Sequence, residues 1–80
     1  MFTLENLVGL TIKTVSFANY GTFGSREENP ALYRLTGYVV YYENGYKTIS
    51  SGGSASSVDY ITLTVLNENN VIVAEFEETL

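Results

Sequence analysis

Tyrosine side chains are the most unusual chemical feature of this 80-residue sequence. It contains seven tyrosines, and four of them, Tyr38, Tyr41, Tyr42 and Tyr46, fall in one short stretch. A tyrosine combines a large apolar ring with a hydroxyl group, and such side chains are enriched where proteins contact one another. On an extended strand, Tyr38 and Tyr42 share one face while Tyr41 lies on the other. Both faces are therefore aromatic, and we expect one to line a core and the other to carry cross-strand pairs or to contact a partner.

Two groups of charged residues could add contacts to such a surface. Arg26, Glu27 and Glu28 are consecutive in a polar stretch, where they are either solvated or bind a partner. Glu75 and Glu77 alternate near the C-terminus and so share one face of a strand. They either protect a sheet edge from aggregation or form an acidic stripe that attracts a basic partner.

The composition argues against catalysis. The chain has no cysteine and no histidine, so it lacks the thiolate nucleophile, the commonest metal ligand and the commonest general base. The serine-rich residues 50–57 have Lys47 as their only candidate base, and no calcium-loop pattern is present. We therefore predict a protein that is not an enzyme, with no catalytic residues, no cofactor and no metal ion.

The charge balance narrows the choice of partners. Four basic residues against nine acidic ones give a net charge of −5, the reverse of a protein that neutralises phosphates, so we expect no nucleic acid and no membrane partner. No apolar run approaches the ~20 residues that span a bilayer, and the N-terminus lacks the basic start of a signal peptide. We expect a cytoplasmic protein, because the absence of cysteine suits a reducing compartment.

Strands are predicted to position these residues. Apolar alternation indicates strands at 10–17, 33–43, 46–50, 58–66 and 71–77, and a change of phase in the first of them predicts a bulge near Lys13 and Thr14. Asn44 and Gly45 predict a tight hairpin. One helical turn is expected over residues 3–8, with Thr3 as its N-cap.

The predicted fold is therefore a single, mainly β domain over residues 1–80. Five strands form an antiparallel meander that curls into a small barrel, similar in shape to SH3-like or OB folds, or stays an open sheet. The fold includes at most one short N-terminal helical turn. A long polar loop covers residues 19–32, with Tyr20 and Phe23 expected to attach it to the body, and a glycine- and serine-rich loop covers residues 51–57.

These observations predict a non-enzymatic protein-binding module. The alternatives are a structural or assembly subunit of a homo-oligomer, since small cores are often completed by association, and a binder of a small neutral ligand that uses the tyrosines and the serine loop. In general character the short, acidic, cysteine-free chain is similar to accessory proteins of bacteriophages and mobile elements, which include small inhibitors of host defence proteins. No motif ties it to a particular family.

Overall fold

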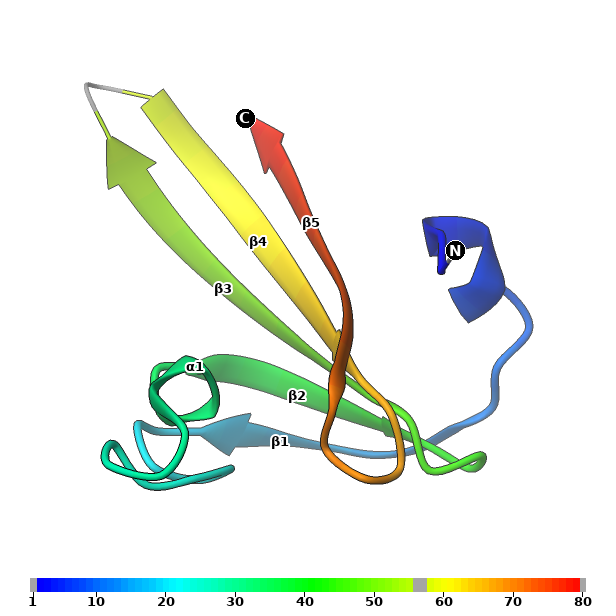
Figure 1. The fold of residues 1–80 in the computed structure, drawn as a ribbon. Coiled ribbons are helices and arrows are strands. Elements are labelled where there is room, and N and C mark those ends of the chain that lie inside the picture. The colour runs from blue at the N-terminus through cyan, green and yellow to red at the C-terminus, as the bar shows by residue number, and fades with distance from the viewer. Residues whose placement is uncertain (1, 56–57, 80) are drawn as a thin grey trace.

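One antiparallel sheet of five strands makes up most of the molecule (Figure 1). The computed structural model describes residues 2–55 and 58–79. The strands follow one another in space as they do along the chain, each pairing antiparallel with the next. They are β1 (Ile12–Ala18), β2 (Gly37–Tyr42), β3 (Lys47–Ala55), β4 (Val58–Leu66) and β5 (Ile72–Thr79). The predicted bulge is confirmed, because the β1–β2 register shifts between Ile12 and Thr14.

The sheet is open, so the prediction of a barrel is wrong and the alternative of an open sheet is confirmed. β1 pairs only with β2, and β5 only with β4, which leaves both strands as edges. The strands differ in length: β3 and β4 each have nine residues, whereas β1 and β2 have seven and six. The far half of the β3–β4 hairpin therefore extends beyond the shorter strands as a projecting arm (Figure 1).

The glycine- and serine-rich segment is a strand rather than the expected loop over residues 51–57. β3 continues through it to Ala55, with Gly52 opposite Ile61 and Gly53 opposite Tyr60. Gly53 has a packing reason, because a Cβ on it would lie 2.8 Å from the Tyr60 ring. Residues 56 and 57, the remainder of the predicted loop, lie outside the described residues.

Two short helical turns flank β1. The predicted N-terminal turn is confirmed as a 3-10 helix, η1 (Leu4–Leu7), where the Thr3 N–H donates to the Asn6 side chain over 2.7 Å. The second turn, α1 (Pro30–Tyr33), falls where the sequence predicted the end of a loop and the start of a strand. Asn29 and Pro30 form a typical helix start. The Asn29 side chain accepts a hydrogen bond from the Leu32 N–H, and the fixed φ of proline suits the first turn of a helix.

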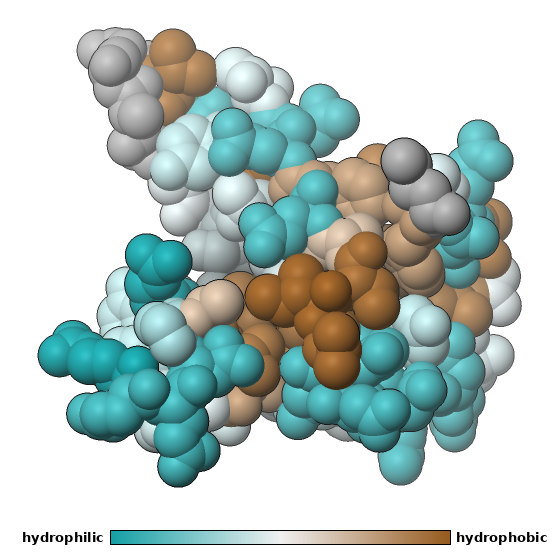
Figure 2. Space-filling model, in the orientation of Figure 1, coloured by the Kyte–Doolittle hydropathy of each residue, from teal (hydrophilic) through white to brown (hydrophobic). Residues whose placement is uncertain are grey.

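The main cluster of buried apolar side chains lies on one face of the sheet. Val39, Ile49 and Leu66 come from three adjacent strands and are almost fully buried, and Leu32 of α1 covers them together with Phe23 of the long loop. Phe23 therefore attaches the loop to the body as expected. Figure 2 shows apolar side chains gathered where β5 begins, and Ile72 at that point packs against the same core. No helix in residues 2–55 and 58–79 is long and apolar enough to cross a membrane.

Candidate functional site

The structure separates the four clustered tyrosines. Tyr41 packs against the core, and Tyr46 stacks on Phe2 with ring centroids 5.9 Å apart. Tyr42 is half-buried, and its N–H donates to the Tyr46 carbonyl where the β2–β3 hairpin closes. Tyr38, by contrast, is 65% exposed. Of these four residues, only Tyr38 presents most of its ring to solvent, so the tyrosine cluster does not form one contact surface.

Tyr38 instead belongs to an exposed patch that includes two residues of β1. Phe17 lies opposite Tyr38 in the register, and the two rings meet edge to face at 5.4 Å. Val15 lies on the same face, and both β1 side chains are 57% exposed. We call Val15, Phe17 and Tyr38 the β1 patch. Val15 and Phe17 were not among the predicted site residues, although the change of phase in β1 was the signal that put them on one face.

The β1 patch is the uncovered end of a longer, mainly apolar row. On the same face of the sheet, the row continues from Tyr38 through Ser50 to Leu63 and Phe76, and these three residues are half-buried. The next row runs from Val15 through Val40 to Thr48 and Val65, both of which are buried. Along these two rows, burial therefore decreases toward β1, and their most exposed apolar side chains lie at that edge.

Main-chain groups add to the patch. The Glu43 N–H donates to the Thr11 carbonyl, and the Tyr42 N–H donates to the Tyr46 carbonyl. The main-chain N–H and C=O groups of successive residues in a strand point to opposite neighbouring strands. The odd-numbered residues of β2 therefore form their main-chain hydrogen bonds with β1. Those residues lie opposite Thr14, Ser16 and Ala18. The N–H and C=O groups of Val15 and Phe17 therefore face the open edge.

The two edges of the sheet differ in charge. β5 carries Glu75, Glu77 and Glu78, all exposed, whereas Lys13 is the only charged residue in β1. Glu75 and Glu77 lie opposite Thr64 and Thr62 and share one face, as predicted. Like charges along an edge repel an added strand, and their absence from β1 leaves that edge open to pairing.

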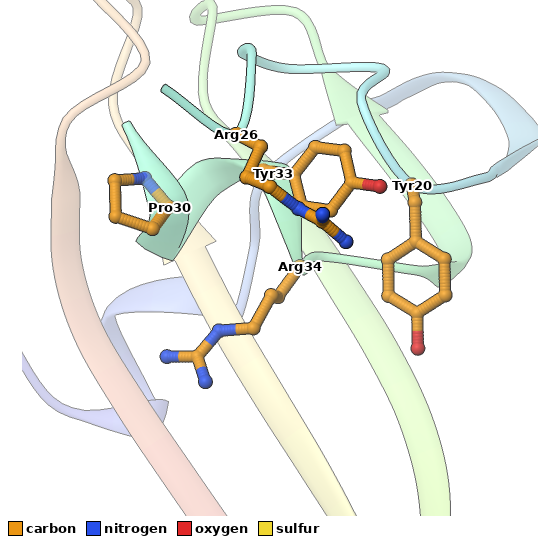
Figure 3. A pocket seen from close by; sticks show the side chains of 5 residues that line it. All are labelled: Tyr20, Arg26, Pro30, Tyr33 and Arg34. Atoms are coloured by element: carbon orange, nitrogen blue, oxygen red, sulfur yellow. The ribbon is translucent and has the colours of Figure 1, made fainter. Parts of the chain in front are cut away.

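The charged loop residues form a different surface from the β1 patch. The Arg26 guanidinium lies 5.2 Å from the centroid of the Tyr33 ring, and Tyr33 stacks on Tyr20 at 5.7 Å. These residues line a shallow depression with Pro30 and Arg34 (Figure 3). Glu27 and Glu28, which follow Arg26 in the sequence, are exposed. The sequence analysis selected Arg26 but not Tyr20, Tyr33 or Arg34, because a fold-dependent turn at α1 brings them together.

Lys47 has a structural partner. Its ammonium group donates to the Asn70 side chain across the turn before β5. Partial burial lowers the pKa of Lys47 below its usual value, and the nearby Glu68 carboxylate partly opposes that shift. Lys47 therefore supports the Asn67–Asn70 turn. Within residues 2–55 and 58–79, no three carboxylates are grouped so that they could hold a metal ion.

No family model matches the chain, and no curated protein or solved structure is significantly similar to it. The molecule thus has two candidate binding surfaces. One is the β1 patch with its open edge, and the other is the depression beside α1.

Proposed function

We propose that this protein is a non-enzymatic binding module whose β1 edge accepts an extended segment of a partner protein. The observation that carries the proposal is the coincidence of free main-chain groups at Val15 and Phe17 with the exposed β1 patch. In strand addition, main-chain hydrogen bonds provide affinity, and side chains on alternate residues provide specificity. The β1 edge offers both features.

The geometry indicates what the partner segment looks like. One face of the added strand lies beside Val15 and Phe17, so its residues there are apolar or aromatic. The other face lies beside Thr14 and Ser16, which favour small or polar neighbours. The net charge of −5 favours a neutral or basic segment over an acidic one. An alternating apolar and polar strand is therefore the expected partner.

The proposal also covers the compartment in which the protein acts and the kind of protein that it targets. The acidic, cysteine-free chain suits a cytoplasmic setting, in which a strand-binding protein of this size could block a host protein by occupying one of its segments. Pairing of β1 with β1 of a second copy would make the protein an assembly subunit instead. Native mass spectrometry at low micromolar concentration separates the two roles, because a monomer supports a foreign partner and a defined dimer through β1 supports self-assembly.

Selection from a displayed library of random peptides tests strand binding without a known partner. We expect the enriched peptides to alternate apolar and polar residues, and to shift the NMR signals of β1 and Tyr38. Recovery of no enriched peptide, or of peptides whose signals map to β5 or to the projecting β3–β4 arm, would contradict the proposal.

Replacing Val15 by proline should abolish peptide binding while the sheet remains folded. The Val15 N–H faces the open edge, so proline removes a donor to the partner and no bond to β2. We expect at least a tenfold loss of affinity, which corresponds to about 1.4 kcal/mol. Val15→Thr keeps the N–H and the branched shape and should bind within about threefold of the parent. Equal losses in the two variants, measured by titration calorimetry, would exclude a main-chain contact at this residue.

Replacing Tyr38 by serine removes the ring that packs against Phe17 on the exposed face. We expect peptide affinity to fall about threefold to tenfold, because Tyr38 lies one strand away from the added segment and acts through the Phe17 ring that it supports, and such ring pairs contribute about 0.5–1.5 kcal/mol. Val71→Ser is the control, because Val71 is also more than half exposed but lies in the turn before β5. If the Val71 variant weakened binding as much as the Tyr38 variant, the contact surface would not be the β1 patch.

A further inference from the structure

The depression beside α1 supports an inference that is independent of strand binding. Tyr20, Arg26, Pro30, Tyr33 and Arg34 surround a shallow space of about 600 Å³ (Figure 3). That volume lies within the range of small-molecule sites. The lining combines two aromatic rings with two guanidinium groups, so the chemistry of a ligand can be argued from both.

The charge of the depression is opposite to that of the protein. The chain has four basic residues and a net charge of −5, yet two of the four, Arg26 and Arg34, line this one space. Of the other two, Lys13 lies in β1 and Lys47 donates to the Asn70 side chain. Guanidinium groups bind phosphate and carboxylate through paired hydrogen bonds. The depression therefore favours an anion, although the molecule as a whole repels one.

The aromatic groups are held in place before any ligand arrives. The Tyr20 and Tyr33 rings are stacked within 19° of parallel. The Gly21 N–H donates to the Tyr33 carbonyl over 3.0 Å, which ties the loop to α1. The Asn19 N–H donates to the Thr22 hydroxyl oxygen, and that hydroxyl donates to the Asn19 carbonyl. A restrained platform loses little entropy on binding, so a flat ring can stack at low cost.

We propose that this depression binds a planar aromatic ring that carries a phosphate group, of mononucleotide size. The ligand ring stacks on the pair formed by Tyr20 and Tyr33, and Arg26 and Arg34 donate hydrogen bonds to the phosphate. A long polyanion is disfavoured, because its remaining charges would face an acidic protein. A single phosphate is affected mainly by charges within about 8 Å at physiological ionic strength, and the charged residues that line the depression are Arg26 and Arg34.

Titration with adenosine 5′-monophosphate, followed by NMR of the full-length protein, tests the proposal. We expect saturable shifts in residues 19–34, with adenosine and inorganic phosphate each binding at least ten times more weakly. Equal binding of adenosine would overturn the role of the arginines, and equal binding of phosphate would overturn the role of the rings. Absence of saturation, or shifts confined to residues outside 19–34, would overturn the site.

A pair of charge-matched variants separates the site from general electrostatics. Arg34→Gln and Lys13→Gln each remove one positive charge from an exposed residue. We expect the Arg34 variant to bind adenosine 5′-monophosphate at least tenfold more weakly and the Lys13 variant to bind within twofold of the parent. Equal weakening in both would show that net charge alone sets the affinity. Thermal unfolding of each variant confirms that the fold is retained, since neither side chain is in the core.

Discussion

Replacing Gly37 by alanine is expected to destabilise the protein by about 3 kcal/mol or more, because the added methyl group has no room and the backbone resists it. Gly37 has a φ of +128°, and a Cβ built there would lie 2.1 Å from the Ser50 carbonyl oxygen. β2 begins at this residue and pairs there with Ala18 of β1. An 80-residue domain has a total stability of roughly 4 to 12 kcal/mol, so the variant should lose a large part of it.

Urea unfolding followed by tyrosine fluorescence measures this loss. Gly52→Ala is the matched control, because Gly52 lies in β3 and an added Cβ there meets only the Tyr60 carbonyl oxygen, at 4.0 Å. We expect the Gly52 variant to unfold within about 0.5 kcal/mol of the parent. If the two variants had the same unfolding midpoint, the close approach of β2 to β3 at Gly37 would be wrong.

Replacing Leu66 by alanine is expected to cost about 2 to 5 kcal/mol, the usual range when a buried leucine leaves a cavity. Leu66 is completely buried and joins β4 to the core formed with Val39, Ile49 and Leu32. Chemical unfolding should show a lower midpoint with two-state behaviour preserved. Truncation at this residue therefore tests whether the Leu66 side chain is part of the packed core.

Leu4→Ala is the control for Leu66→Ala, since it removes the same atoms from a side chain that is 45% exposed in η1. We expect the free energy of unfolding to fall by less than about 1 kcal/mol, because the Leu4 side chain buries less apolar area than the Leu66 side chain. A Leu4 variant as unstable as the Leu66 variant would mean that the core extends to the N-terminal turn.

Local signals were sufficient for much of the fold. The alternation over residues 58–66 predicted β4 with the same bounds, and the phase change at Lys13 and Thr14 predicted the bulge. Asn44 and Gly45 marked the hairpin between β2 and β3. Each of these features depends on residues that are adjacent in sequence, so no knowledge of distant contacts was needed.

Features set by distant contacts were not predictable in the same way. The segment from Ser51 to Ala55 lacks strand propensity, yet it pairs with β4, and the Tyr60 ring fills the space that Gly53 leaves. α1 is a four-residue helix, too short to show a periodic pattern. Closure of a barrel requires a matched tilt and stagger of all its strands, which local sequence signals do not define.

The candidate sites show the same division. Tyr38 was selected from composition, but its exposure depends on Phe23 and Leu32 covering the opposite face. Phe17 became its neighbour only through the register that follows the bulge. Arg26 was selected as part of a charged run, whereas its contact with Tyr33 required the helical turn. The residue types were evident from the sequence, and their pairing was a property of the fold.

Hydrogen exchange at the Val15 and Phe17 amides tests strand binding at β1 most directly. In the free protein these amides should exchange rapidly, while those of Thr14 and Ser16 are protected by pairing with β2. Addition of the most enriched library peptide should slow exchange at Val15 and Phe17 at least tenfold and leave β5 unchanged. Unaltered exchange at both amides with the peptide bound would contradict strand addition at this edge.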